Sequence, residues 1–172
     1  MPSCPWSQTG KSFSYWSGNR SGTDGVYYAD RTYYFSSDKD LYAIWETDSY
    51  WQGADVVSGS SQGVDSVSVN NVEGGTYVDY GGTAVWRCTT NPGYTFAGWY
   101  DSNGTKISSN NPYTRSNVTS ALTLYADINA TTYSAYASSA GFGCCFSSVK
   151  VDKSSFTYGA TVTFTANLNP GY

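Results

Sequence analysis

The chain has 172 residues, no histidine, a formal net charge of −4 and a charged fraction of only 13%. The lack of histidine excludes imidazole acid-base chemistry and histidine-containing zinc sites. Clustered Lys and Arg side chains are also missing, so nucleic acid is not an expected partner. No stretch approaches the roughly 20 apolar residues of a membrane-spanning helix, and we expect no membrane insertion within this segment.

Residues 1–46 contain a motif that recurs later in the chain. Its glycine, phenylalanine and tryptophan reappear 83 residues further on, and Leu-Tyr-Ala begins 25 residues after each tryptophan. The matched positions are Gly10, Phe13 and Trp16 in the first copy, and Gly93, Phe96 and Trp99 in the second. Self-similarity at a fixed spacing is typical of stacked or strung modules. We therefore interpret residues 1–46 as the C-terminal half of a repeat unit.

Residues 47–64 interrupt this pattern. They read TDSYWQGADVVSGSSQGV, and their Gly and Ser content predicts a linker between modules. Tyr50 and Trp51 are unusual in a linker, where aromatic side chains have nothing to bury. We expect these two side chains to pack on the neighbouring module rather than to stay free in solvent.

Residues 65–128 contain all the elements of one complete unit. Ala84, Trp86 and Cys88 alternate with other residues, and the positions 78 residues later are again apolar. The segment around Leu124 and Ala126 alternates in the same way. Such period-two alternation predicts strands that bury one face, and the composition of residues 101–104, Asp-Ser-Asn-Gly, predicts a hairpin turn.

Residues 129–172 are interpreted as the N-terminal half of a following, truncated unit. Positions 80–94 match positions 158–172, with seven identities in fifteen. Both copies end in Asn-Pro-Gly-Tyr, in which proline fixes φ and glycine permits a positive φ at a chain reversal. The expected turn residues are Gly10, Pro92, Gly93, Pro170 and Gly171. The chain therefore reads as an excerpt that is cut in the middle of a unit.

Aromatic side chains are expected to supply most of the core, because the sequence has 17 Tyr and 6 Trp but few long aliphatic runs. The predicted core positions are Phe13, Trp16, Leu41, Ala43, Trp86, Phe96, Trp99, Leu124, Ala126 and Phe164. Stacking of Phe96 and Trp99 on a sugar is the alternative, but repetition at fixed spacing favours a core role. Aromatic residues that the other copy does not match are candidates for a contact surface, with half-buried strand packing as the alternative. They are Tyr27, Tyr28, Tyr33, Tyr34, Trp51, Tyr100 and Tyr113.

The motifs together resemble the Listeria-Bacteroides repeat, also called the internalin B-repeat, including its divergent form. The resemblance is carried by Tyr80-Gly81-x-Thr83, by the run from Asn91 to Tyr100, and by Leu124-Tyr125-Ala126. It implies a bacterial extracellular or cell-surface protein with many such units and a small β-grasp-like fold. We therefore expect a mainly β chain of tandem small modules, one complete unit flanked by two partial units.

Residues for chemistry are not evident. The carboxylates fall in turns or near strand ends, and the 101–104 segment begins like a calcium loop but lacks the closing Glu. We expect no enzyme activity, no metal and no cofactor. Cys88 occupies an inward position and is expected to be a small buried side chain. A Cys4–Cys88 bridge, a vicinal Cys144–Cys145 bridge and a bond from that pair to Cys88 all stay open.

The sequence thus predicts a structural or interaction repeat region of a bacterial secreted or cell-surface protein. It would act as an adhesin-type stalk or spacer that makes weak, multivalent contacts with a protein or glycan on a host or matrix surface. The alternative is a carbohydrate-binding or accessory module of a large extracellular enzyme. Because the two ends carry opposite halves of a unit, we also expect residues 131–172 of one copy to complete residues 1–46 of another, giving head-to-tail self-association.

Overall fold

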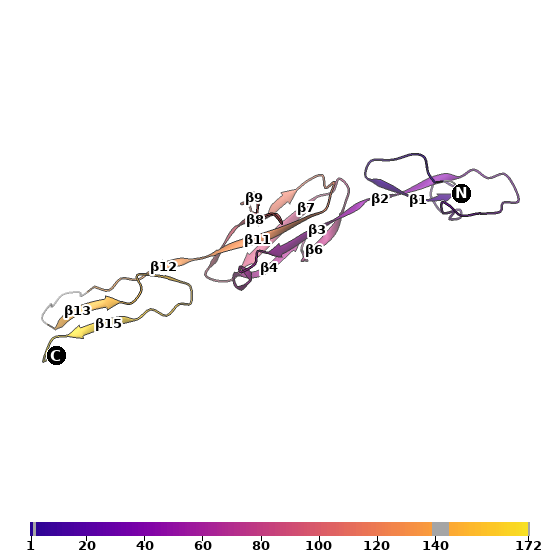
Figure 1. Ribbon diagram of the computed structural model, residues 1–172. Helices are drawn as coiled ribbons and strands as arrows, with labels where there is room; N and C mark the ends of the chain where they lie inside the picture. Colours follow the sequence, from indigo (N-terminus) through magenta and orange to yellow (C-terminus); the bar gives the residue numbers. More distant parts are fainter. Residues whose placement is uncertain (2, 139–144, 172) are drawn as a thin grey trace.

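The computed structural model describes residues 1, 3–138 and 145–171, and it shows a chain built almost entirely of strands (Figure 1). Three groups of strands follow one another along an elongated molecule, with the two termini at opposite ends. Within the described residues the only helical element is the short 3-10 turn Ser61–Gly63. The expectation of a mainly β chain of small modules is therefore confirmed.

The N-terminal group is a two-stranded antiparallel sheet of β1 (Lys11–Ser17) and β2 (Tyr42–Thr47). The C-terminal group contains two further antiparallel pairs. They are β12 (Thr132–Ser134) with β14 (Ser155–Thr157), and β13 (Phe146–Val151) with β15 (Phe164–Leu168).

The central unit is a sandwich of two sheets. Its five-stranded sheet has the order β6-β3-β11-β8-β9, and its four-stranded sheet has the order β10-β7-β4-β5. The first sheet contains β3 (Ser49–Val56), β6 (Gly75–Asp79), β8 (Tyr94–Tyr100), β9 (Lys106–Ser108) and β11 (Leu122–Ala130). The second contains β4 (Val64–Val69), β5 (Val72–Glu73), β7 (Ala84–Thr90) and β10 (Tyr113–Arg115).

The core of the central unit lies between these two sheets. Trp86 on β7 and Trp99 on β8 are both fully buried, and the indole N–H of Trp86 donates to the Gly53 carbonyl at 2.7 Å. Phe96 packs against this cluster at 5.4 Å from Trp99. A ring that is fully enclosed offers no face to a sugar, so the position of Trp99 supports the core role. The remaining buried members are Ala54, Val69, Val78, Ala84, Cys88, Val118, Leu124 and Ala126.

Residues 47–64, which the sequence indicates as a linker, instead contain a central strand. β3 pairs antiparallel with β6 and parallel with β11, so it lies inside the five-stranded sheet. The Gly and Ser residues that suggested a linker lie mainly in the turn after β3. The unit consequently starts at Ser49 and runs to the end of β11 at Ala130.

A polar residue on the inner face of β3 explains why the sequence pattern does not predict a strand here. Gln52 is fully buried, and its amide nitrogen donates to the carbonyls of Trp51 and Ser120, each at 2.9 Å. Its amide oxygen accepts from the guanidinium of Arg115 at 3.2 Å. These bonds satisfy a buried side chain that would otherwise be costly. An alternating apolar pattern is therefore absent from β3.

The flanking groups repeat the strand pairing of the central unit. Trp16 opposite Ala43 on β1 and β2 corresponds to Trp99 opposite Ala126 on β8 and β11, and each ladder has its irregularity at the equivalent place. Likewise β12 pairs with β14 as β3 pairs with β6, and β13 pairs with β15 as β4 pairs with β7. The three groups are thus parts of one repeated fold.

The predicted core positions outside the central unit are buried to different degrees. Trp16 is only 7% exposed, whereas Phe13, Leu41 and Ala43 are half-buried. Phe164, expected in the core, is 58% exposed. Its counterpart Trp86 lies in a core that also contains Trp99 of β8 and Leu124 and Ala126 of β11, and the described C-terminal residues contain no equivalent of those two strands.

The structure defines the bonding state of Cys4 and Cys88. Cys4 and Cys88 are both free, so the structure contains neither a Cys4–Cys88 bridge nor any other bond to Cys88. Burial raises the pKa of the Cys88 thiol above its ordinary value of 9.0. The alternative of a Cys144–Cys145 bridge lies outside the described residues.

Candidate functional sites: the unit joints and the outer aromatic face

The joints between units are the first candidate site. β2 ends at Thr47 and β3 begins at Ser49, while β11 ends at Ala130 and β12 begins at Thr132. One residue, Asp48 or Thr131, therefore separates the last strand of each unit from the first strand of the next. Figure 1 shows these strand pairs as nearly continuous lines between the groups. Such a connection leaves little length for a flexible hinge.

Both joints are closed by the same backbone hydrogen bond. The N–H of Asp48 donates to the carbonyl of Gly10 at 2.9 Å, and the N–H of Thr131 donates to the carbonyl of Gly93 at 2.8 Å. Gly10 and Gly93 are equivalent turn residues, with φ values of +69° and +80°. The turn glycines of the repeat motif thus contact the chain just where it leaves their own unit.

A tyrosine of the following unit covers each of these glycines. A Cβ atom on Gly10 would lie 2.2 Å from the ring of Tyr80, and a Cβ atom on Gly93 would lie 2.0 Å from the ring of Tyr158. Tyr80 and Tyr158 are themselves equivalent residues of the Tyr-Gly-x-Thr motif. Glycine is required at both places because any side chain would displace the ring, and positive φ adds a backbone reason. Gly171, at the same position of the last group, also has a positive φ of +95°.

The outer face of the five-stranded sheet is the second candidate site. Its inner face is covered by the second sheet, whereas its outer face carries aromatic side chains from four strands. Trp51 and Tyr77, opposite each other on β3 and β6, pack edge to face at 5.4 Å. Tyr125 on β11 lies opposite Tyr100 on β8. We call these four side chains the outer aromatic face.

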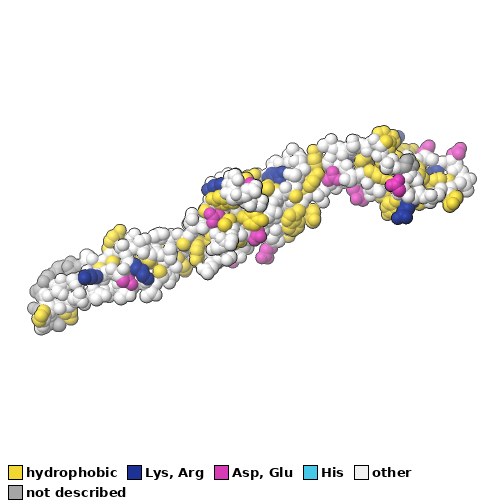
Figure 2. Space-filling model, in the orientation of Figure 1, with side chains coloured by type: hydrophobic (Ala, Val, Ile, Leu, Met, Phe, Trp, Pro, Cys, Tyr) yellow, Lys and Arg dark blue, Asp and Glu magenta, His cyan; other side chains and the backbone are white. Residues whose placement is uncertain are grey.

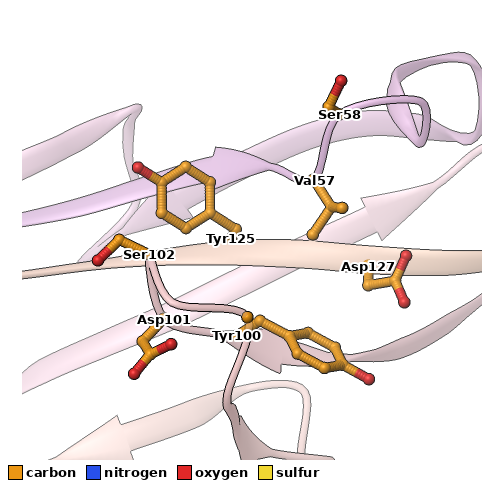
Figure 3. Close-up of a pocket in the computed structure, with 8 residues that line it drawn as sticks. Val57, Ser58, Tyr100, Asp101, Ser102, Tyr125 and Asp127 are labelled. Atoms are coloured by element: carbon orange, nitrogen blue, oxygen red, sulfur yellow. The ribbon is translucent and has the colours of Figure 1, made fainter.

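A hollow of about 400 Å3 opens beside Tyr100 and Tyr125. Figure 3 shows it between these two rings, Val57 and the carboxylate of Asp127, with Asp101 at its rim. A second hollow of about 380 Å3 continues on the side of Thr123 and shares Asp101 and Tyr125 with the first. The two hollows adjoin at Asp101, Ser102 and Tyr125, and we call them together the groove.

The two carboxylates of the groove are held in place by protein donors. The Oδ1 atom of Asp101 accepts from the backbone N–H groups of Asn103 and Thr105 at 2.9 and 2.8 Å. The Oδ1 atom of Asp127 accepts from the Ser60 hydroxyl and from the Ile128 N–H, both at 3.0 Å. The Asp101 bonds also close the predicted 101–104 hairpin turn. Within the described residues, no group of three His, Cys, Asp or Glu side chains is placed to hold a metal ion.

The predicted contact-surface residues do not form one surface. Trp51 and Tyr100 lie on the outer aromatic face, but Tyr113 packs on the buried Trp86 at 5.6 Å. Tyr113 therefore belongs to the core, because Trp86 is one of the two tryptophans buried between the sheets. Sequence reasoning missed Tyr77 and Tyr125. Tyr125 is matched by Tyr42 in the first copy, which made it look like part of the repeated scaffold.

The other four predicted contact residues lie in the long loop of the first unit. Tyr27 packs edge to face on Tyr33 at 5.1 Å, and the Tyr33 hydroxyl accepts the N–H of Tyr28. Tyr34 is 96% exposed. Three of the four thus stabilise the loop itself.

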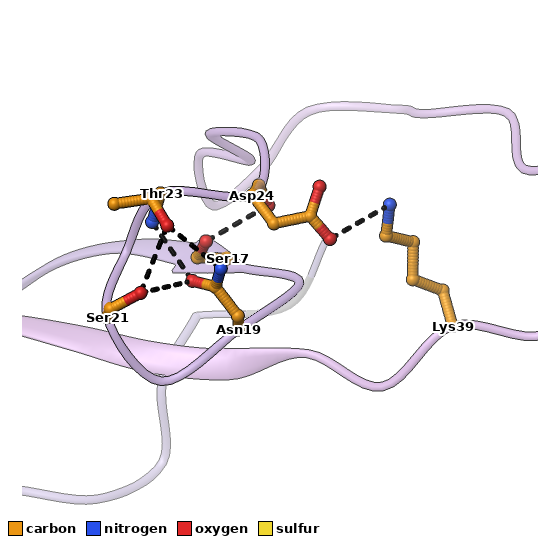
Figure 4. A network of polar contacts seen from close by, with 6 residues as sticks. All are labelled: Ser17, Asn19, Ser21, Thr23, Asp24 and Lys39. Atoms are coloured by element: carbon orange, nitrogen blue, oxygen red, sulfur yellow. Dashed lines mark hydrogen bonds and ion pairs between the residues drawn. The ribbon is translucent and has the colours of Figure 1, made fainter.

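Polar contacts fix the start of the same loop (Figure 4). Asn19 exchanges hydrogen bonds with Ser21 and Thr23, and Lys39 forms an ion pair with Asp24 at 3.6 Å. Hydrogen bonding to Tyr27, together with the Asp24 charge, raises the pKa of Lys39. The loop is therefore held by its own side chains.

Charge is sparse over the whole molecule, and Figure 2 shows Lys, Arg, Asp and Glu side chains scattered on the visible face without a basic cluster. Among the described residues, no helix has the length and apolar character needed to cross a membrane.

The fold and the joints define a protein of tandem β units connected strand to strand. Residues 60–127 match the family model of the Listeria-Bacteroides repeat domain. The family is found in bacterial surface proteins. The matched segment begins after β3 has ended at Val56. β3 nevertheless belongs to the same five-stranded sheet as β8, which lies inside the matched segment. No curated protein and no solved structure matches the chain.

The joint geometry predicts the effect of filling the turn glycines. Ala at both Gly10 and Gly93 should push the covering tyrosines away and loosen both joints, so small-angle X-ray scattering should show a broader distribution of maximum dimensions. Gly104→Ala is the matched control, because Gly104 has a similar φ of +78° but no atom near its Cβ position. The control should keep the wild-type scattering curve. A double variant whose curve overlays the wild type would refute the role of the tyrosine contacts.

Proposed function

We propose that this chain is a spacer region of a bacterial secreted or cell-surface protein, an adhesin-type stalk made of tandem β units. The observation that carries the proposal is the direct passage from the last strand of one unit into the first strand of the next. Within the central unit, β3 and β11 are parallel neighbours, so the chain enters at one end and leaves at the other. Each added unit then lengthens the molecule.

The proposed role needs no chemistry from the chain itself. The sequence has no histidine, and the two groove carboxylates are engaged in turn and backbone hydrogen bonds. We propose extracellular or cell-surface localisation. The proposed partners are a protein or glycan of a host or matrix surface, bound through weak contacts that many units repeat.

A stalk must carry tension, and the strand arrangement predicts how the central unit resists it. Force applied through Asp48 and Thr131 loads the parallel β3–β11 ladder along the strands, so all its hydrogen bonds must break together. Force applied through Ser49 and Asp79 would open the antiparallel β3–β6 pair from one end, one bond at a time.

Single-molecule force spectroscopy with handles at these two pairs of positions tests the prediction. We expect a higher unfolding force for the first pair at the same loading rate, because forced unfolding follows the barrier that must be crossed. Equal unfolding forces for the two directions would contradict the tension-bearing role.

A second candidate function is supported by the outer aromatic face. In this role the central unit would be a carbohydrate-binding or accessory module of a large extracellular enzyme. Exposed aromatic rings beside fixed carboxylates are suited to sugars, since a sugar has both an apolar face and a hydroxyl rim. The spacer role does not require this face.

Head-to-tail self-association remains a prediction. The strand register that recurs between units indicates which strands of two copies would pair. β2 corresponds to β11 and has only β1 as a neighbour within the described residues, whereas β11 also pairs with β3. β12 corresponds to β3. A second copy could therefore place β12 and the residues after it beside β2, with Ala137 next to Leu41 as Ala54 lies next to Leu124.

Light scattering over a range of concentrations measures this association. We expect the mass to rise with concentration for the wild type, and to stay at that of the monomer for Ser138→Pro. Ser138 corresponds to Asp55, whose N–H lies on the β11 side because the N–H of the preceding Ala54 donates to Gly74 on the other side, so proline at Ser138 removes a donor to β2. A wild-type chain that remains monomeric at the highest concentration would reject the prediction.

A further inference from the structure

The outer aromatic face has the layout of an extended binding platform. Trp51 and Tyr125 are four strand positions apart in register, which corresponds to about 13 Å along the strands. Gly53 and Thr123 lie between them, and a Cβ atom on Gly53 would lie within 2.8 Å of the Trp51 indole nitrogen. The absence of a side chain at Gly53 thus keeps the surface between the two aromatic pairs low and continuous.

The rings of this face are accessible enough to make contacts. Tyr77 is 67% exposed and Trp51 is 40% exposed, while Tyr100 and Tyr125 are half-buried at the groove. Large aromatic side chains with a polar atom at one end lose little conformational entropy on binding and supply much of the contact area at recognition surfaces. A row of such rings on a flat sheet suits a long ligand that has repeated apolar faces.

Hydrogen-bond acceptors lie beside the rings at one end of the row. Asp101 and Asp127 each use Oδ1 for protein donors, and within the described residues no hydrogen bond reaches the Oδ2 atom of either side chain. Each Oδ2 atom therefore keeps its acceptor capacity, on a side chain that lines the groove. Sugar hydroxyls are donors, so an aromatic ring with a fixed carboxylate beside it satisfies both surfaces of a sugar ring.

The charge of the face selects against acidic ligands. Asp55, Asp101 and Asp127 all lie on or beside it. The nearby cation, Lys106, donates to the Ala97 carbonyl at 2.7 Å and lies over the Tyr100 ring. Three carboxylates against one ammonium group leave the face net negative, so a uronate or sulfate group would be repelled, whereas a neutral sugar meets no such penalty.

This face is particular to the central unit. The positions that correspond to Tyr100, Asp101 and Asp127 in the first unit are Ser17, Gly18 and Ile44. The core and joint positions, by contrast, recur in both units. The groove is therefore not a by-product of the repeated scaffold.

We propose that the outer aromatic face of the central unit binds a neutral polysaccharide, with Trp51, Tyr100 and Tyr125 stacking on sugar rings and Asp101 and Asp127 accepting from hydroxyls. This deepens the second candidate function and rests on it. It does not depend on the spacer role, which the force and scattering measurements test separately.

Affinity electrophoresis of the full chain is the direct test. The gels would contain neutral polysaccharides (mixed-linkage β-glucan, xyloglucan, galactomannan) or acidic ones (alginate, polygalacturonate), and insoluble cellulose and chitin would be tested by sedimentation. We expect retardation or co-sedimentation with at least one neutral polysaccharide and none with the acidic ones. A folded chain that binds none of the neutral polysaccharides, or binds only the acidic ones, would overturn the proposal.

Variants locate the binding on this face. Tyr125→Ala and Tyr100→Ala should each weaken binding about tenfold, since loss of one stacked ring removes on the order of 1.4 kcal/mol. Trp51→Ala should do the same. Because Trp51 lies outside the groove, this variant still tests the face if either tyrosine variant fails to fold. Tyr34→Ala is the matched control, because Tyr34 is 96% exposed on the first unit. Equal losses for Tyr34→Ala and Tyr125→Ala would overturn the assignment to this face.

Discussion

The parallel pairing of β3 with β11 is the constraint on which the rest of the structure depends. These strands are the first and last of the unit, and they lie side by side within one sheet. Because they run in the same direction, the chain must enter and leave at opposite ends. A strand that leaves one unit can then continue as the first strand of the next, with only Asp48 or Thr131 between them. The elongated shape follows from this pairing (Figure 1).

Residues that recur between units and residues that do not recur have different roles in this chain. The repeated tryptophans at 16 and 99 fill the interior, and the repeated glycines at 10 and 93 receive a tyrosine from the following unit. These positions are fixed by close packing, which tolerates little change in volume. The unrepeated Tyr100 and Asp127 lie on the outer face, where packing imposes no such limit. A new surface can therefore arise on one unit without disturbing the array.

The sequence predicts the strands and the central core well, because fixed spacing and alternation report directly on which side of a strand is buried. It fails where a partner distant in sequence decides the outcome. The strand β3 has a buried Gln52 whose bonds come from Arg115 and Ser120, so alternation gives no signal there. The exposure of Phe164 and the burial of Tyr113 likewise depend on which strand lies opposite. The joint contacts were hidden because a glycine motif indicates a turn and does not show which ring covers it.

The most direct measurement of the central claim compares the unfolding of two fragments in denaturant. A fragment of residues 49–130 retains β3, whereas a fragment of residues 65–128 lacks it. We predict a cooperative transition for the first. The second should show none, because β11 would lose its parallel partner and the core would lose the cover of Ala54 and Gln52. A cooperative transition at the same denaturant midpoint for both fragments would contradict the account.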